Sequence, residues 1–222
     1  MPQITTLSNK NDPSFQVPNT FFKQDTDTDH LALILPGLNY TCDMPLLYYS
    51  TQIMLGAGAD VVQVKYDYTE KTMEKSVTLP EKVALLQKDV TKITSVALEQ
   101  SKYQRLTVIG KSLGTLGISC LLEAAFPVKP QICIFLTPIL QQMLVAFEMI
   151  KSCPNTFYVI GTTDPYYDPE LIVKFRSKQP DNFLIIEGVN HSLELPGDTI
   201  HSLSVLDNIV RRLNMFIKEE VR

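Results

Sequence analysis

One segment of this chain restricts its possible folds more than any other. In it, a short strand pattern leads through two glycines into an apolar helix. Residues 105–109 read RLTVI, a pattern typical of a buried strand, and GKSLG follows at 110–114. In such a strand-to-helix turn the serine is held in a strained conformation, and side chains two residues away on either side would collide. The context therefore predicts a nucleophile elbow with Ser112 at its tip, whereas a serine that only caps the helix is the alternative.

Elsewhere in the chain, short apolar runs alternate with helical patterns. The predicted strands are residues 30–35, 60–66, 105–109, 131–136, 156–160 and 182–186, and the predicted helices are residues 44–57, 80–101, 112–126, 138–152, 168–178 and 199–219. This alternation predicts an α/β fold, namely a mainly parallel twisted sheet of about six to eight strands with helices on both faces. Within residues 1–28, the runs 3–7 and 14–23 would form an edge hairpin.

The composition fits one domain that spans residues 1–222. With 45% apolar residues the chain can bury a large core. Its formal charge is −4 and it has no basic run, so we expect no binding of nucleic acid. No apolar run reaches the roughly 18 residues of a membrane span, and the polar N-terminus differs from a signal peptide, so we expect a cytoplasmic protein without a membrane partner. The four cysteines lack ligand spacing, and we expect neither a metal nor an organic cofactor. The oligomeric state is not indicated.

Three polar residues of the types used in nucleophilic catalysis follow three of the predicted strands. Ser112 follows the strand that leads into GKSLG, Asp164 lies in IGTTDPYYD, and His191 lies in IIEGVNHSLE. Functional groups of a parallel sheet collect at the carboxyl ends of the strands, so we expect these side chains to meet. A serine, a histidine and an aspartate in contact predict a nucleophile, a general base and the acid that orients the base.

Other residues compete for two of these roles. His30 begins a predicted strand and so lies at the opposite edge of the sheet, and His201 falls in the last predicted helix, which leaves His191 as the base. Asp164 could instead only form the turn before Pro165. The remaining candidates for the acid are Asp67, Asp168 and Glu187.

The residues at the expected carboxyl edge of the sheet form four motifs. They are LPGLNY at 35–40, GKSLG at 110–114, GTTDP at 161–165 and GVNHSLE at 188–194. These motifs, and the chain order serine, aspartate, histidine, resemble the α/β-hydrolase superfamily over residues 30–219. Within it the chain looks like the small lidless group of dienelactone hydrolases and their serine relatives, which implies no large cap. It departs from dienelactone hydrolases in carrying Ser112 instead of a cysteine, and from a common pattern in carrying Pro36 instead of a histidine before Gly37.

The expected function is that of a serine hydrolase that cleaves a small acyl ester, as a carboxylesterase does, through an acyl-enzyme. We expect the backbone amides of Leu38 and Leu113 to stabilise the oxyanion, with Asn39 as a substitute for Leu38. A thioesterase, another acyl hydrolase and a non-catalytic binding module of the same fold are the alternatives. Because only one helix fits between 131–136 and 156–160, we expect an open site for a small-molecule acyl substrate.

Several other side chains near these motifs have expected places. Loop tyrosines at the same edge are expected to contact the substrate, with packing at the rim as the alternative. They are Tyr40, Tyr68, Tyr166 and Tyr167. Lys111, inside the GKSLG motif, is expected to extend along the strand with its ammonium in water. Cys42 has no neighbour to lower its pKa, so we expect a buried filler.

Overall fold

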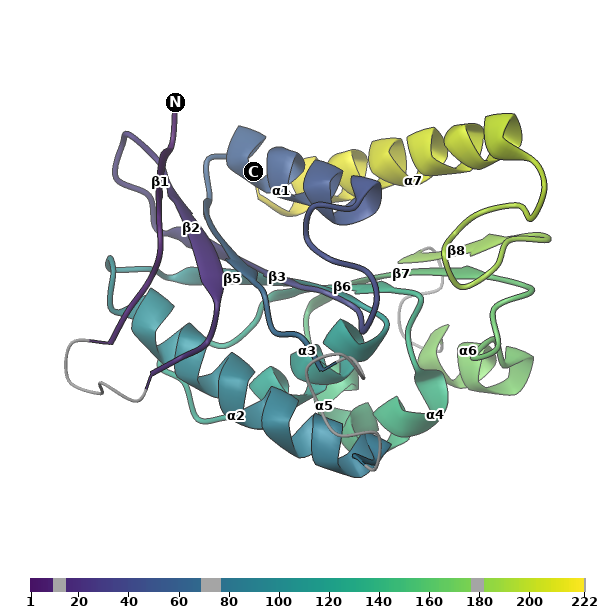
Figure 1. Ribbon diagram of the computed structural model, residues 1–222, viewed down its shortest axis with the longest axis horizontal. Coiled ribbons are helices and arrows are strands. Elements are labelled where there is room, and N and C mark those ends of the chain that lie inside the picture. Colours follow the sequence, from purple (N-terminus) through teal and green to yellow (C-terminus); the bar gives the residue numbers. More distant parts are fainter. Residues whose placement is uncertain (10–14, 69–76, 177–181, 222) are drawn as a thin grey trace.

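A sheet of eight strands forms the centre of the computed structural model, which describes residues 1–9, 15–68, 77–176 and 182–221 (Figure 1). The strands are β1 (Gln3–Thr5), β2 (Asn19–Lys23), β3 (His30–Leu35), β4 (Asp60–Val64), β5 (Arg105–Lys111), β6 (Ile132–Leu136), β7 (Asn155–Gly161) and β8 (Phe183–Ile186). Their order is β1-β2-β4-β3-β5-β6-β7-β8; β3 to β8 run parallel, and β1 and β2 pair antiparallel at one edge. The mainly parallel sheet is the one that the sequence predicts. Parts of two predicted elements, at residues 14 and 177–178, lie outside the described residues.

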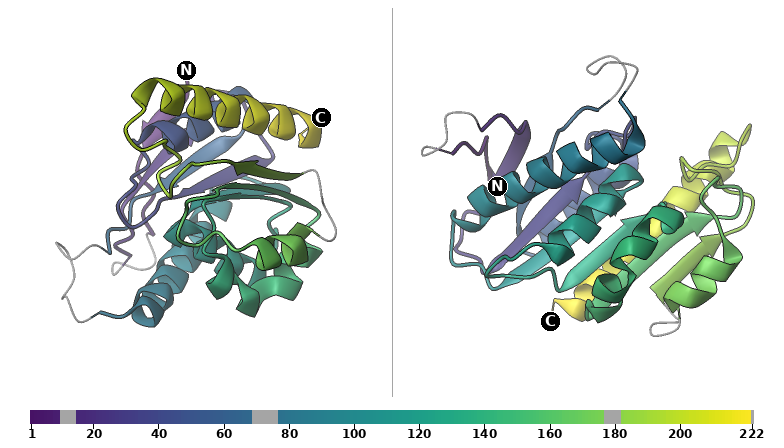
Figure 2. Two further views of the ribbon diagram at one scale, coloured as in Figure 1. Left: turned by 90° about the vertical axis from the view of Figure 1, so that its right-hand side faces the viewer. Right: turned by 90° about the horizontal axis from the view of Figure 1, so that it is seen from below.

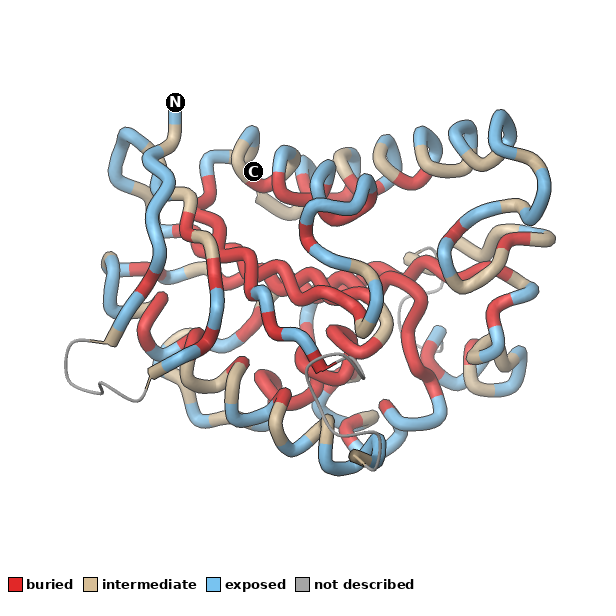
Figure 3. Tube along the Cα trace, viewed as in Figure 1, coloured by how far each residue is buried: buried red, intermediate tan, exposed pale blue. Residues whose placement is uncertain are grey.

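Helices cover both faces of this sheet (Figures 1 and 2). One face carries α1 (Pro45–Gly56) and α7 (Thr199–Glu220); the other carries α2 (Leu79–Leu98), α3 (Leu113–Glu123), α4 (Leu140–Met143), the 3₁₀ helix η1 (Leu144–Ala146), α5 (Phe147–Ser152) and α6 (Pro169–Arg176). The central strands are therefore buried on both sides, which explains why they read as continuous apolar runs. All six residues of β3 are buried, and Figure 3 shows the buried trace through the middle of the molecule.

Helix boundaries follow local sequence signals. At the start of α2, Thr78 and Glu81 form a capping box in which a carboxylate oxygen of Glu81 accepts from the Thr78 amide at 2.7 Å. Pro80 lies in the first turn of this helix, where its missing N–H is not needed. Helix α1 ends at Gly56, and Gly58 follows with a φ of 81°, a conformation that glycine adopts without strain.

The single helix predicted at 138–152 is wrong, because the chain there forms α4, η1 and α5. The buried residues Leu140, Met143 and Ala146 recur every three positions, and a 3₁₀ turn keeps residues three apart on one side. The intervening Val145 is exposed. Only these short segments separate β6 from β7, so the structure has no large cap at this point, as the sequence predicts.

All four cysteines are buried, and none forms a disulfide. Burial raises the pKa of the Cys42 thiol to about 12, so the thiol stays protonated near neutral pH. Cys42 Sγ lies 3.4 Å from the carbonyl oxygen of Val64. The structure therefore places Cys42 as the buried filler that the sequence predicts.

Candidate active site

The turn from β5 into α3 places Ser112 at the carboxyl edge of the sheet, by which we mean the edge where β3 to β8 end. Ser112 has φ 51° and ψ −115°, a strained conformation for a residue with a side chain. A Cβ on Gly110 would lie 2.4 Å from the carbonyl oxygen of Gly114, and a Cβ on Gly114 would lie 2.2 Å from that of Leu35. The two glycines are therefore what allow the turn, and the Ser112 amide anchors it by donating to the carbonyl oxygen of Leu136 at 2.9 Å.

Ser112 Oγ lies 2.8 Å from His191 Nε2, although the two residues are far apart in sequence. Ser112 occupies the N-cap position of α3 but makes no side-chain capping bond, which argues against a role as a cap alone. His191 lies in the loop between β8 and α7. There Asn190 Oδ1 accepts from two amides of the same turn and so shapes the loop around His191.

Asp164 completes the contact from the loop after β7. Its Oδ2 lies 2.8 Å from His191 Nδ1, and its Oδ1 accepts from the Tyr166 amide at 2.8 Å. The Asp164 side chain is fully buried, whereas that of His191 is 31% exposed. The loops after β7 and β8 touch at Gly161, where a Cβ would lie 2.0 Å from the carbonyl oxygen of Val189. This close approach is what brings Asp164 and His191 together.

The competing acids lie in other environments. Asp168 Oδ1 accepts from the amides of Glu170 and Leu171 at the start of α6. Asp67 and Glu187 are exposed. In the described residues, the carboxylate that contacts His191 is that of Asp164.

The turn after β3 lies directly against the serine. The amide of Gly37 donates to the carbonyl oxygen of Tyr40 at 3.0 Å, which places Leu38 and Asn39 at the tip of a tight turn. A Cβ on Gly37 would lie 3.3 Å from Ser112 Cβ. Within the described chain the Leu38 amide has no hydrogen-bond acceptor. This turn therefore offers a free donor close to Ser112.

Helix α3 offers a second donor. Leu113 is its first residue, and the first amides of a helix have no partner within it. Leu113 follows Ser112 directly, so its amide belongs to the same turn. The positions of Leu38 and Leu113 agree with the predicted oxyanion site, whose role stays a prediction.

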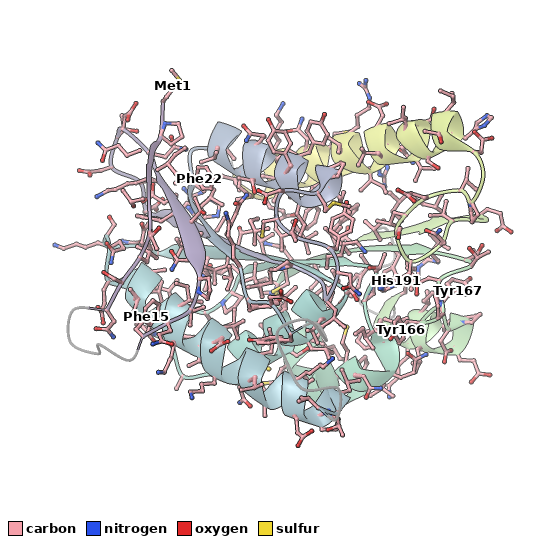
Figure 4. All side chains as sticks on the ribbon, in the orientation of Figure 1. Met1, Phe15, Phe22, Tyr166, Tyr167 and His191 are labelled. Atoms are coloured by element: carbon pink, nitrogen blue, oxygen red, sulfur yellow. The ribbon has the colours of Figure 1, made fainter. Side chains whose placement is uncertain are left out.

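Two of the predicted tyrosines lie beside this site. The ring of Tyr166 meets the His191 ring edge-on, with centroids 5.3 Å apart, and Figure 4 shows both side chains with Tyr167 at one end of the molecule. Tyr40 is half-buried, its hydroxyl accepts from the Leu46 amide at 3.1 Å, and burial raises its pKa. Tyr166 is the one of these whose ring contacts His191.

Tyr68 follows β4 outside regular secondary structure, as the sequence predicts, but its side chain is buried instead of open to a substrate. Tyr68 is 6% exposed, stacks on Tyr66 at 4.9 Å, and donates its hydroxyl to a carboxylate oxygen of Asp89 at 2.5 Å. Its partner Asp89 lies on α2, and no local pattern indicates that contact. Tyr66 was missed by the sequence reasoning; its hydroxyl donates to the carbonyl oxygen of Pro36 at 2.6 Å and holds the turn that carries Leu38.

The structure also corrects the placement of Lys111, which we expected to reach water. Lys111 is 1% exposed, and its Nζ donates to Thr137 Oγ1 and to the backbone oxygen of His191, each at 2.9 Å. Burial lowers the pKa of Lys111 to about 8. The ammonium turns inward because polar partners from two distant segments enclose it.

Two hollows border the site. One of about 440 Å³ is lined by the turn at Gly37 to Asn39 and by Tyr66 and Asp67. The other, of about 500 Å³, lies between α2, α3 and η1 and is lined by Leu116, one turn along α3 from Ser112. Ser112 and His191 line neither of these two hollows, and Ser112 is partly exposed.

Two kinds of site are not found in the described part of the chain. Among its helices, none combines the length and apolar character needed to cross a bilayer. In the same residues, no three His, Cys, Asp or Glu side chains come together as ligands for a metal ion.

Comparison with solved structures identifies the fold of this chain. No protein-family model and no curated protein matches the sequence. The structure is similar to a dienelactone hydrolase from Anabaena variabilis (TM-score 0.69, 15% identity, covering 98% of each chain). It is also similar to an α/β serine hydrolase without a lid from Xanthomonas campestris (TM-score 0.63, 14% identity, covering 98% of this chain and 94% of that one).

A third similar structure is the esterase Pf2001 from Pyrococcus furiosus, with a TM-score of 0.63 and 15% identity over 99% of this chain and 92% of that one. At these identities the likeness establishes the fold. The chain has the α/β-hydrolase fold, as the resemblance of its motifs implies. Among the similar structures are a dienelactone hydrolase and a lidless serine hydrolase, the group that the motifs resemble.

Proposed function

We propose that this chain is a serine hydrolase that cleaves small acyl esters. The observation that carries the proposal is the pair of 2.8 Å contacts that joins Ser112 Oγ, His191 and Asp164. A serine hydroxyl is a weak nucleophile near neutral pH, and a base within hydrogen-bond reach activates it. The α/β-hydrolase fold supports the proposal by analogy, since one fold hosts many functions.

In the acylation step, Ser112 Oγ attacks the carbonyl carbon of the ester while its proton passes to His191 Nε2. The tetrahedral intermediate collapses, the alcohol leaves with the proton from His191, and the acyl group remains on Ser112. Water then attacks this acyl-enzyme with His191 again as the base. The acid is released and Ser112 regains its proton.

Asp164 fixes the ring of His191 during both steps. With the proton of neutral His191 on Nδ1, this nitrogen donates to Asp164 Oδ2 and leaves Nε2 free to accept from Ser112. When His191 becomes an imidazolium, the buried carboxylate stabilises its charge. The amide of Tyr166 holds the second oxygen of Asp164 and so fixes the carboxylate in turn.

The backbone amides of Leu38 and Leu113 stabilise the negative charge that develops on the carbonyl oxygen. Both lie next to Ser112, on the turn after β3 and at the start of α3. Loss of one such donor typically costs about 2.7–4 kcal/mol in the barrier. Tyr66 has a supporting role here, because its hydroxyl anchors the turn at Pro36.

The surroundings of Ser112 favour a small or protruding acyl group. Only short helices lie between β6 and β7, so no large cap restricts access at this point. Tyr40 and Tyr166 border the site and would contact the substrate through their rings. Thioesters pass through the same kind of tetrahedral intermediate, so the substrate class must be compared directly.

A fluorophosphonate probe tests the proposal. We expect covalent labelling of the wild type and of Ser95→Ala, a matched variant of an exposed serine on α2, but not of Ser112→Ala. Hydrolysis of p-nitrophenyl esters and acyl thioesters of increasing chain length then ranks the substrates. Folded wild type that is neither labelled nor active on any of them would contradict the proposal and favour a non-catalytic binding module.

A further inference from the structure

Lys111 precedes Ser112, and three groups from other parts of the chain enclose its ammonium. Nζ donates to Thr137 Oγ1 and to the backbone oxygen of His191, each at 2.9 Å. It also lies 4.7 Å from the centre of the Tyr40 ring, within cation–π range. A lysine ammonium has three N–H donors, so these three partners match its bonding capacity.

One of these contacts connects the two halves of the proposed site. The loop that carries His191 has no regular secondary structure, and Asn190 shapes it mainly through bonds within the same turn. The bond from Lys111 to the His191 backbone oxygen ties this loop to β5, the strand that leads into Ser112. A second bond ties β5 to Thr137, which has a positive φ of 47° just after β6.

We propose that Lys111 is a positioning residue: its ammonium fixes the backbone of His191 and thereby the 2.8 Å contact between His191 Nε2 and Ser112 Oγ. In this role Lys111 touches no substrate and transfers no proton. Its effect on rate rests on the proposed function, whereas the fixed position of His191 is a property of the folded chain. Burial of a charge is costly unless its partners compensate, so an apolar side chain would suit this place better if no such contact were needed.

The charge of Lys111 makes the contact dependent on pH. Burial lowers its pKa from 10.5 to about 8, and the carboxylates of Asp164 and Glu194 partly oppose this shift. The other groups that face it are the ring of Tyr40, whose own pKa is raised by burial, and His191. Lys111 is therefore charged at neutral pH and loses its proton as the pH rises past about 8. A neutral amine makes a weaker bond to a carbonyl than an ammonium does.

The test compares Lys111→Met, which keeps an unbranched side chain one atom shorter and removes its donors, with Lys88→Met, a matched change of an exposed lysine on α2. For wild type and Lys88→Met, we expect kcat on a p-nitrophenyl ester to fall above about pH 8. For Lys111→Met at pH 7, we expect kcat to be about 10- to 100-fold lower, KM to stay within about twofold, and the alkaline fall to be absent. Unchanged kcat with the same alkaline fall would overturn the proposal.

Thr137→Val provides a second variant in case Lys111→Met does not fold. It removes one acceptor of the ammonium and leaves the bond to His191, so the pKa of Lys111 should fall further. The alkaline fall in kcat should then move to lower pH. An alkaline fall at the same pH as in wild type would contradict the role of Lys111.

The proton on His191 Nδ1 gives a readout that does not need activity. The chain has three histidines, so His191→Ala assigns this proton in an NMR spectrum. We expect its resonance to broaden or disappear in Lys111→Met but not in Lys88→Met. If wild type is inactive and this change occurs, the positioning role holds and the proposed function fails; if the resonance is unchanged, the positioning role fails whatever the activity.

Discussion

Two histidines of this chain each lie 2.8 Å from a hydroxyl oxygen, at opposite edges of the same sheet. His30 Nε2 contacts Thr107 Oγ1 at the amino end of β3, and His191 Nε2 contacts Ser112 Oγ at the carboxyl edge. His30 is 1% exposed and its Nδ1 has no partner among the described residues. His191 is partly exposed, and its Nδ1 contacts Asp164.

The two histidines differ in features that would decide whether an imidazole beside a hydroxyl can act as a base. Burial and, to a smaller extent, the nearby charge of Arg105 lower the pKa of His30 to about 4, and Asp29 opposes the shift. An imidazole that resists protonation is a poor general base. Thr107 also lies inside β5, where its neighbours pair with adjacent strands, whereas Ser112 stands at the start of a helix with free amides.

The third histidine completes the comparison. His201 Nδ1 contacts Asp198 Oδ2 at 2.5 Å in an exposed place at the start of α7, with no hydroxyl partner among the described residues. His30 thus has a hydroxyl without an acid, His201 has an acid without a hydroxyl, and His191 has both. If this combination is what distinguishes His191, removal of either of its partners or of its ring should abolish more activity than the same change at His30 or His201.

Removal of the imidazole itself should have the largest effect. We expect His191→Ala to lower kcat on a p-nitrophenyl ester about 10⁶-fold, because a serine hydroxyl without its base is unreactive. His30→Gln and His201→Ala should leave kcat within about twofold of wild type. Comparable losses in either of these folded variants would show that the comparison between the histidines is misplaced.

Removal of the acid alone should cost less. In Asp164→Asn the amide donates to His191 Nδ1 and forces the proton onto Nε2, the wrong tautomer, so we expect kcat to fall about 10⁴-fold. Asp198→Asn changes the same kind of pair at His201 and serves as the control. Equal activity of the two variants in steady-state assays would contradict the role of Asp164.

Most of the fold follows from the pattern of the sequence, because parallel strands buried on both faces leave long apolar runs. The strand predicted at 30–35 matches β3 residue for residue, and helix 199–219 ends within one residue of α7. The polarity of the strands also separates His30 from His191 before any coordinates are known. The same rule places Ser112 and Asp164 at the edge where they meet.

The misplaced side chains share a physical cause. Lys111 and Tyr68 are polar residues that look exposed in a local pattern, but each is buried by a partner from a distant segment, the backbone of His191 and the carboxylate of Asp89. A single sequence carries no local signal for such contacts. The catalytic role of Ser112, His191 and Asp164 stays a prediction, because His30 also lies close to a hydroxyl and proximity alone does not establish a role.

A substitution that changes none of the proposed catalytic side chains should still lower kcat if it displaces the loops that carry them. A Cβ at Gly161 would lie 2.0 Å from the backbone oxygen of Val189, so Gly161→Ala must push apart the loops that carry Asp164 and His191. A misplacement of about 1 Å can cost about 10²-fold in kcat, and we expect a loss of that size with a lower Tm. Gly56→Ala, where no atom lies within 4 Å of the added Cβ, is the matched control. Full activity of Gly161→Ala would indicate that the loops tolerate separation.

The smallest expected effect is a change in the pH dependence of the unfolding free energy, caused by the titration of His30. Its pKa is about 4 in the folded chain, against an ordinary value of 6.5 for an exposed histidine, so the unfolded chain binds more protons between these values. The neutral ring is compatible with the fold above pH 6.5, and stability is lost as the pH falls towards 4. We expect this group to account for about 2 kcal/mol of the loss in unfolding free energy between pH 7 and pH 5.

Urea unfolding of wild type and His30→Gln at these two pH values measures the effect. Glutamine does not titrate, so the variant should lose about 2 kcal/mol less than wild type over the same range, whatever its stability at pH 7. His201→Ala removes an exposed histidine and should follow the wild-type curve closely. If His30→Gln loses as much stability as wild type on acidification, the ring of His30 must accept a proton in the folded chain, which would contradict its lowered pKa.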